Sequence, residues 1–432
     1  MARAIGRGSP LCILGLYIYL LAHSWLRWMD PMVDFPRDLY LAWRVSEGDL
    51  LYKTLANWYG PLAQLVEGSA FKLFGVGIDT IIWSNIALTA VVVILLRDLF
   101  QTLGNRLSGW LAAVVFLAVF AFGHYMANAN YNFIAPYVAQ STYSFAGLVV
   151  VLWSLVHHLK SERSWWLGLT GLGLAVVGVA AALMMVRIFL NGRIYHFGFF
   201  MMPLAAIWLV HLMVVEAAQR ALDGQRNNHL LPIAFTGLVL VGVYATAQTS
   251  LGVYAIKNFE VGEGRDHFYT YELKVFYNGQ LLKDAMKAFK LATPQAKTLA
   301  VFPEGIAVNY HLRVRSSLAE VDFHPPALAY AGPAHVLAEL NAHPPESIIL
   351  LAQDFSEFGR PYFGTDEAGG RNVLLWINDH YWLAAVEGHG QEANISITHD
   401  VMDLVKPRTP GSTGITLLRD DNNAPLAPEN VH

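Results

Sequence analysis

The sequence predicts an α-helical polytopic membrane domain of about seven spans, followed by a small soluble α/β domain. Three observations lead to this fold class. Of the 432 residues, 55% are hydrophobic and only 14% are charged, whereas soluble domains carry roughly 25% charged residues. Residues 1–250 hold 15 Lys and Arg against 11 Asp and Glu, and residues 251–432 hold 14 against 22. Apolar runs of span length occur in the first of these regions, so the two regions are expected to face different solvents.

This composition also limits the function. It excludes an ordinary soluble enzyme, a disordered chain and a nucleic-acid binder with a basic face, so no nucleic-acid partner is expected. The single cysteine, Cys12, lies in an apolar run and permits neither an internal disulfide nor a cysteine-ligated metal site.

The membrane spans are predicted from length, since a transmembrane helix needs roughly 20 apolar residues. The first candidate follows Arg3 and Arg7. We expect an uncleaved anchor rather than a signal peptide, because Ala22-His23-Ser24 is a poor cleavage site. The seven candidates lie near residues 10–27, 77–97, 108–125, 133–157, 165–189, 197–216 and 231–250.

The charges of the short loops predict a cytoplasmic N-terminus. Basic pairs occur in alternate loops, and these are Arg97 with Arg106, Lys160 with Arg163, and Arg220 with Arg226. The opposite loop 124–132 has no Lys or Arg. With seven spans, residues 251–432 would lie outside, which predicts an integral protein of a bacterial inner membrane with a periplasmic C-terminal domain.

The chain is therefore divided into a membrane domain at 1–250, an extracytoplasmic α/β domain at 251–406 and a loose tail at 407–432. Within the first, residues 28–75 form a long outer loop, and residues 62–74 are expected to be a helix lying in the membrane interface. In the α/β domain, helices are predicted at 281–291 and 334–341, and strands at 298–302 and 347–352. Their alternation suggests parallel strand pairing.

The outer loop contains the strongest local signal for chemistry. It holds six of the eleven acidic residues of the membrane domain, including Asp34 and Asp38. On a helix that starts near Pro36, Arg37, Tyr40 and Arg44 share one face. A carboxylate at the membrane surface can take a proton from an incoming hydroxyl if a neighbouring cation keeps it ionised. The alternative is that Asp34 caps the helix and that Arg37, Asp38 and Arg44 form surface ion pairs.

At these residues the chain resembles a family. The early Asp34, the Tyr40-Leu41-Ala42 stretch, Glu47-Gly48-Asp49-Leu50-Leu51-Tyr52 and Tyr59-Gly60-Pro61-Leu62 resemble the outer loop of polytopic GT-C glycosyltransferases, which include protein O-mannosyltransferases and the lipid A aminoarabinose transferase. Asn130-Tyr131-Asn132, Pro303-Glu304-Gly305 with Asn309-Tyr310, and Asp354-Phe355-Ser356 are similar to uncharacterised bacterial members.

The resemblance implies an enzyme that transfers a sugar from a polyprenyl-phosphate donor to an acceptor on the outer side of the membrane, with inversion. The acceptor would be a glycan, a lipid or a protein. An acidic residue of the first outer loop would be the base, which makes Asp34 the first catalytic candidate and Asp38 the second. Many members have adjacent Asp-Glu at this point, whereas Phe35 follows Asp34 here. Arg37, Tyr40 and Tyr59 would support the loop.

A phosphate leaving group also needs cations where negative charge develops. The candidates are Arg187 near the outer end of the fifth span, Arg193 and His196 in the following loop, and Lys53. Alternatively, the two arginines snorkel to lipid headgroups. No metal or other cofactor is expected, although a divalent cation could bind the acids of 30–49. The second hypothesis for the whole chain is a non-enzymatic transporter or an anchoring subunit, with membrane lipids as its surroundings.

Overall fold

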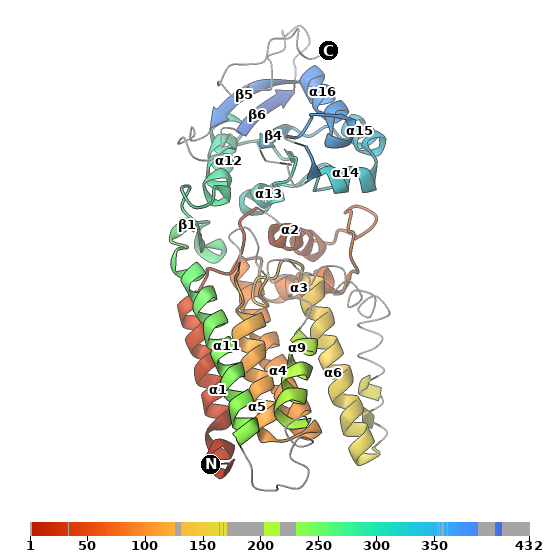
Figure 1. The fold of residues 1–432 in the computed structure, drawn as a ribbon. Helices are drawn as coiled ribbons and strands as arrows, with labels where there is room; N and C mark the ends of the chain where they lie inside the picture. Colours follow the sequence, from red (N-terminus) through yellow and green to blue (C-terminus); the bar gives the residue numbers. More distant parts are fainter. Residues whose placement is uncertain are drawn as a thin grey trace. The chain divides into compact units, whose positions relative to one another are not determined.

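The structure is a computed structural model, and it divides the chain into two compact units (Figure 1). Residues 1–29 and 77–258 form a helical unit, and residues 30–76 and 259–432 form an α/β unit. The residues that it describes are 2–32, 34–125, 131–163, 165–166, 168–170, 203–216, 230–351, 353, 355, 358–360, 362–387 and 402–407. Most of the expected span 165–189, with Arg187, Arg193, His196 and nearly all of the expected tail, lies outside these residues.

The helical unit contains helices of two lengths. Those long and apolar enough to cross a bilayer are α4 (Ile78–Leu103), α6 (Ala139–Ser161) and α11 (Leu230–Ala255). The shorter apolar segments are the 10–24 part of α1 (Ala2–Ser24), α5 (Arg106–Val115) continued by the π-helical η1 (Phe116–Ala121), and α9 (Pro203–His211) continued by η3 (Leu212–Glu216). This unit is therefore the membrane-associated part of a mostly helical protein.

The expected number of seven spans is not supported. Within the described residues, three helices satisfy the length and composition of a span, at the positions of the expected spans 77–97, 133–157 and 231–250. The expected spans 10–27, 108–125 and 197–216 correspond to shorter apolar helices. An apolar stretch alone does not fix where a helix begins and ends, because caps and breakers interrupt it.

The start of α6 illustrates this effect. The expected span began at residue 133, whereas the helix begins at Ala139. The Asn132 side chain accepts hydrogen bonds from the backbone N–H groups of Ile134 and Ala135, at 2.9 and 2.7 Å, and donates to the carbonyl of Trp28. Pro136 follows at once and restricts the residue before it. These contacts keep residues 132–138 outside the helix.

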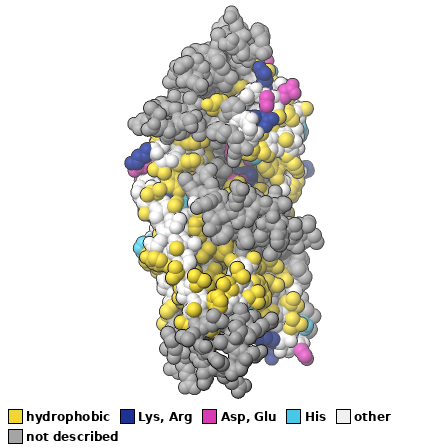
Figure 2. Space-filling model, in the orientation of Figure 1, with side chains coloured by type: hydrophobic (Ala, Val, Ile, Leu, Met, Phe, Trp, Pro, Cys, Tyr) yellow, Lys and Arg dark blue, Asp and Glu magenta, His cyan; other side chains and the backbone are white. Residues whose placement is uncertain are grey.

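The helical unit exposes many of its apolar side chains. Figure 2 shows hydrophobic side chains spread over its surface, with few charged ones among them. The exposed positions include Leu11, Leu14, Ile18, Trp83, Val91, Ile94, Leu238, Val241 and Tyr244. In water such a surface would be unfavourable, so its natural surroundings are lipid.

The α/β unit is built on a four-stranded sheet in the order β3-β4-β6-β5. Strands β3 (Leu299–Phe302) and β4 (Ser347–Leu351) pair in parallel, as the alternation of helices and strands predicted. Strands β6 (Met402–Pro407) and β5 (Tyr381–Glu387) continue it in antiparallel fashion. Strands β1 (Phe259–Val261) and β2 (Phe268–Thr270) form a separate antiparallel pair.

Helices surround this sheet. The expected helices at 281–291 and 334–341 are confirmed as α12 (Asn278–Ala292) and α15 (Pro333–Ala342). The other helices of the unit are α2 (Phe35–Ser46), α3 (Leu62–Phe74), α13 (Ile306–Leu312), α14 (Pro325–Ala331) and α16 (Arg371–His380), with short 3-10 turns at 264–266 and 367–369.

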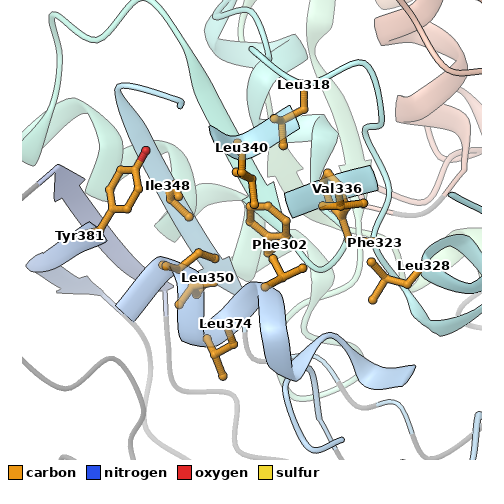
Figure 3. Packing of buried hydrophobic residues seen from close by; sticks show 13 residues of the cluster. Phe302, Leu318, Phe323, Leu328, Val336, Leu340, Ile348, Leu350, Leu374 and Tyr381 are labelled. Atoms are coloured by element: carbon orange, nitrogen blue, oxygen red, sulfur yellow. The ribbon is translucent and has the colours of Figure 1, made fainter. Parts of the chain in front are cut away.

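One buried cluster forms the apolar core of this unit, and Figure 3 shows how its side chains converge between the sheet and α14–α16. The Phe302 and Phe323 rings lie 4.3 Å apart, and Leu340 on α15 is fully buried. At roughly 1.5–3 kcal/mol for each large apolar side chain removed from water, this core is the main source of stability of the unit. Its members are Ala300, Phe302, Leu318, Phe323, Leu328, Val336, Leu340, Ile348, Leu350, Val373, Leu374, Ile377 and Tyr381.

Residues 30–76, which the sequence analysis assigned to the membrane domain, fold into the α/β unit. The backbone N–H of Ala56 donates to the carbonyl of Ala319 at 2.9 Å. The Asn278 amide donates to the Asp30 carboxylate at 3.2 Å, and Arg265 donates to the carbonyl of Phe74. Helices α2 and α3 therefore contribute side chains directly to this unit.

Candidate functional site

The site starts at the first turn of α2. Pro36 occupies one of the first two helical positions, where its missing N–H costs nothing. Asp34 stands before the helix with φ of 56°, a left-handed conformation that is uncommon for a residue other than glycine. Its carbonyl accepts from the backbone N–H of Asp38 at 3.1 Å. Its carboxylate makes no capping hydrogen bond to the helix, so this buried side chain has a role other than that of an N-cap.

Arg37 is the cation of the site. Its Nη2 lies 3.2 Å from Oδ1 of Asp34, and its Nη1 lies 3.8 Å from Oδ2 of Asp322. The guanidinium also lies over the rings of Trp58 and Tyr59, 5.6 and 5.3 Å from their centroids. Burial alone would lower the pKa of Arg37, but the charges of Asp34, Asp38 and Asp322 outweigh it and raise that pKa. Arg37 therefore stays charged although it is buried.

A second group of side chains follows the end of β3. The strand ends at Phe302, and a cis peptide bond precedes Pro303. The backbone of Glu304 then forms an isolated antiparallel β-bridge with the backbone of Asp322. The next residue is Gly305. A Cβ at this position would lie 2.5 Å from Cγ1 of Val301 and 2.6 Å from Cδ1 of Leu351, so a larger residue would have to displace these side chains. In sheets of this kind ligands bind outside the carboxyl ends of parallel strands, and Glu304 occupies such a position.

The titratable groups at this strand end influence one another. Burial and the nearby carboxylates of Asp322, Asp34 and Asp30 raise the pKa of Glu304 well above its usual range, despite the opposing charge of Arg37. His324 contacts Oδ1 of Asp322 through Nδ1. Burial lowers the pKa of His324, but the hydrogen bond and the charge of Asp322 outweigh it, so the net pKa is raised. The raised pKa favours the protonated form of Glu304.

Asp38 faces the inner side of α3. It is almost fully buried, and the Gln64 amide donates to its Oδ1 at 3.0 Å. Glu67 lies one turn further along α3, is 1% exposed, and neither of its carboxyl oxygens has a hydrogen-bond partner. Burial, followed by the charge of Asp38, raises the pKa of Glu67 well above its usual range. The raised pKa favours the neutral form of the Glu67 carboxyl group beside Asp38.

Aromatic side chains enclose the charged groups. The ring of Trp58 lies 5.6 Å from that of His324 and 6.0 Å from that of Tyr330, and its indole N–H donates to Glu320 at 3.4 Å. Phe358 lies 5.5 Å from His324 on another side. Low-polarity walls of this kind strengthen the electrostatic interactions of the groups between them.

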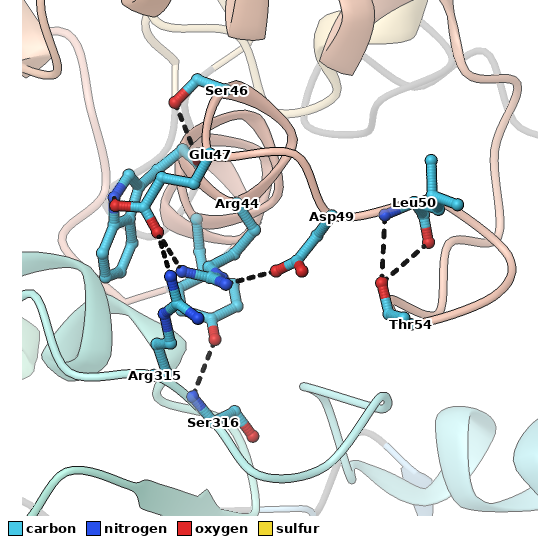
Figure 4. A network of polar contacts seen from close by, with 10 residues as sticks. Arg44, Ser46, Glu47, Asp49, Leu50, Thr54, Arg315 and Ser316 are labelled. Carbon is cyan, nitrogen blue, oxygen red and sulfur yellow. Dashed lines mark hydrogen bonds and ion pairs between the residues drawn. The ribbon is translucent and has the colours of Figure 1, made fainter.

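The far end of α2 forms a separate polar network, shown in Figure 4. Arg44 forms ion pairs with Glu47 and Asp49, and Arg315 contacts Glu47 at 2.8 Å. The hydroxyl of Tyr40 accepts from the backbone N–H of Ser316 at 2.8 Å, and burial raises the pKa of Tyr40 to about 12. This network fixes α2 to the loop at 315–316 and is structural.

The structure brings together several predicted site residues. Asp34, Arg37, Asp38 and Tyr59 lie in one neighbourhood, whereas Tyr40 belongs to the structural network just described. Lys53 is exposed in a turn of the outer loop. The positions of Arg187, Arg193 and His196 lie outside the described residues.

Several residues of the site were not found by sequence reasoning. They are Trp58, Glu67, Glu304, Asp322 and His324. Glu304 carried a signal, because it follows a predicted buried strand in Pro303-Glu304-Gly305. Asp322 and His324 carried none, since nothing in the surrounding sequence relates them to Asp34. We call Asp34, Asp38, Glu304 and Asp322, with Arg37 and His324, the carboxylate cluster.

Clustered carboxylates can also bind a metal ion. In the part of the chain that the structure describes, no three or more His, Cys, Asp and Glu side chains are arranged so that they could hold a metal ion. The cation that faces the carboxylates there is the Arg37 guanidinium.

The fold and the site define a membrane-associated, mostly helical protein with an α/β unit that buries a carboxylate cluster. No protein-family model matches the chain, and no curated protein is significantly similar to it in sequence. The chemistry of the carboxylate cluster is therefore what points to a function.

Proposed function

We propose that this protein is a membrane glycosyltransferase of the GT-C type, with Asp34 as the general base. One observation carries the proposal: Asp34 is a buried carboxylate that caps no helix and is ion-paired to Arg37 at 3.2 Å. A general base must be ionised and aimed at the proton that it removes. Arg37 satisfies the first requirement, and the left-handed backbone at Asp34 presents its side chain apart from the helix amides.

The neighbours of Asp34 support a division of roles. Environments that push the pKa values of adjacent carboxyl groups apart are typical of acid–base sites. Here the pKa of Glu304 is raised by burial and by its acidic neighbours, while Arg37 favours the charged form of Asp34. A neutral Glu304 leaves the ion pair with Arg37 intact and reduces the repulsion within the carboxylate cluster.

The reaction is a single displacement. The acceptor hydroxyl gives its proton to Asp34, its oxygen bonds to the anomeric carbon of the sugar, and the bond from that carbon to the polyprenyl-phosphate oxygen breaks. The configuration inverts, and the carrier leaves as a phosphate. Asp38, held by Gln64 at 3.0 Å, is the second candidate for the base.

Positive charge must stabilise the departing phosphate. We assign this role to Arg187, Arg193 and His196, with Lys53 as a further candidate. We further propose that the donor comes from the lipid, that the acceptor is a glycan, lipid or protein, and that the α/β unit faces the periplasm of a bacterium with the N-terminus in the cytoplasm.

Sugar transfer in membranes expressing the chain tests this function. A panel of labelled polyprenyl-phosphate sugars is offered to the wild-type protein, to Asp34→Asn and to Asp38→Asn. We expect Asp34→Asn to lower the rate by about 10²–10⁴-fold, which is the usual contribution of a general base. The matched control is Asp49→Asn, which removes another arginine-paired aspartate of the same loop outside the carboxylate cluster.

The outcomes separate the hypotheses. Activity lost in Asp38→Asn but kept in Asp34→Asn would move the base to Asp38. Equal losses in Asp34→Asn and Asp49→Asn would point to folding rather than chemistry. Neither turnover nor donor binding across the panel would favour a transporter or anchoring subunit.

A further inference from the structure

Helix α3 (Leu62–Phe74) buries two polar side chains and exposes several large apolar ones. Its inner face contains Gln64 and Glu67, which are 0% and 1% exposed. Its outer face contains Leu65, Val66 and Leu73, which are 50%, 40% and 75% exposed. Ala63 and Phe71 are buried beside these two polar side chains, and Ser69 and Lys72 are exposed beside the apolar ones, so the unusual feature of α3 is its row of exposed leucine and valine side chains.

The outward residues form one continuous stripe. Leu62, Leu65, Val66, Ser69, Lys72 and Leu73 follow the spacing of a single helical face. The opposite stripe is buried against α2, and it is packed so closely that a Cβ on Gly68 would lie 3.1 Å from the carbonyl oxygen of Ala42. The outer stripe is therefore a defined surface of a firmly seated helix.

The chain itself identifies what covers this surface. Only Gly75, Val76 and Gly77 separate α3 from α4, which is long and apolar enough to cross a bilayer. The chain from Phe74 to Ile78 therefore spans at most about 15 Å. Leu73 and Phe74, which are exposed, belong to the turn of α3 that leads directly into this span.

We propose that α3 lies flat on the lipid bilayer, with Leu65, Val66 and Leu73 inserted among the lipid chains and Lys72 directed to the headgroups. In-plane helices of this kind bind through an apolar face with basic residues beside it. Gln64, on the opposite face, contacts Asp38 at 3.0 Å. Since a helix is about 10 Å thick, α3 fixes Asp38 roughly one helix diameter from the lipid.

The proposal does not depend on the proposed activity, and spin labels test it without an assay for turnover. A Cys12→Ser protein is labelled at Leu73→Cys and, separately, at Leu291→Cys, and is placed in phospholipid nanodiscs. Leu291 is the matched control, because it is a 66% exposed leucine near the end of another helix of the α/β unit, α12. Oxygen, which concentrates in lipid, and a water-soluble nickel chelate are the two relaxing agents.

We expect the ratio of oxygen to nickel accessibility to be severalfold higher at Leu73 than at Leu291. A label at Leu65→Cys should behave like the one at Leu73. Equal nickel accessibility at Leu73 and Leu291 would overturn the proposal, since α3 would then face water. A Leu73 label shielded from both agents would also overturn it, because a protein surface would then cover the helix.

Discussion

The α/β unit buries two regions of opposite chemistry, the apolar core around Phe302 and the carboxylate cluster that begins two residues later at Glu304. The core removes apolar surface from water and stabilises the fold. The carboxylate cluster removes charged groups from water, which costs free energy unless each charge is well paired. It contains four carboxyl groups, with Arg37 as its cation and His324 in contact with Asp322. The carboxylate cluster therefore contributes less to stability than the core beside it, and the proposed activity would account for its presence.

Removing the charge of Arg37 should have the largest effect, because it damages both properties of the carboxylate cluster. Arg37→Gln leaves Asp34 and Asp322 buried without their cation, which should lower the free energy of unfolding by about 3–5 kcal/mol. Sugar transfer should fall by about 10²-fold or more as the charge beside the base is lost. Thermal unfolding in detergent and the transfer assay measure the two effects.

The control for this variant is Arg360→Gln. Arg360 forms an ion pair with Asp366 at 2.7 Å, but both side chains are more exposed. Exposed pairs contribute up to about 1 kcal/mol. If Arg37→Gln were no more destabilising than Arg360→Gln, the carboxylate cluster would be solvated rather than buried.

A truncation in the apolar core should separate stability from activity. Leu340→Ala leaves a cavity at a fully buried position on α15 and should lower the free energy of unfolding by about 2–5 kcal/mol. The rate per folded molecule should stay unchanged, because Leu340 belongs to the core cluster and not to the carboxylate cluster. A fall in that rate at a temperature where the variant is folded would contradict the separation of the two regions.

The pH dependence of folding stability tests the cost of burying Glu67 next to the carboxylate cluster. Because the pKa of its buried carboxyl group is raised in the folded protein, the native state holds a proton that the unfolded chain releases above about pH 4.5. Folding stability should therefore fall as pH rises through the range between the two pKa values, by up to about 1.4 kcal/mol per pH unit. Glu67→Gln should abolish this decline. The unfolding temperature of the variant, relative to that of the wild type, should therefore increase as pH rises.

Glu47→Gln is the control, because the pKa shift of Glu47 has the opposite sign to that of Glu67. Burial acts to raise the pKa of Glu47, but hydrogen bonds from Trp43 and Arg315 and the charge of Arg44 outweigh it and lower the pKa. The stability due to Glu47 is present above its unfolded pKa and lost on acidification, so Glu47→Gln should lose stability at neutral pH. The same pH trend in both variants would contradict a neutral, buried Glu67.

The smallest effect is expected for one hydrogen bond at the edge of the apolar core. The hydroxyl of Tyr381 donates to the carbonyl of Pro345 at 2.7 Å. Tyr381→Phe should lower the free energy of unfolding by about 1 kcal/mol without altering sugar transfer. Tyr330→Phe, at a side chain that is 74% exposed, should leave stability unchanged in the same measurement. A loss in Tyr330→Phe as large as that in Tyr381→Phe would assign the effect to something other than the buried bond.

The sequence by itself determined the features that depend on short-range pattern. Apolar runs located the long helices α4, α6 and α11, and alternating helix and strand patterns located α12, β3, α15 and β4. The residues after Asp34 predicted a helix that starts near Pro36, and this helix is α2. These features follow from the periods of helices and strands and from contacts between near neighbours, which a sequence displays directly.

Only the tertiary structure decided which distant residues complete the site. Asp322 and His324 lie nearly 300 positions after Asp34, and residues 30–76 belong to the α/β unit rather than to the unit of the spans next to them in the sequence. The sequence predicted an interfacial helix at 62–74, but a periodic pattern does not show which of the two faces of a helix is buried, and the packing of α3 against α2 decides that. Burial and long-range pairing arise when chain segments pack against one another, and no local spacing records which segments those are.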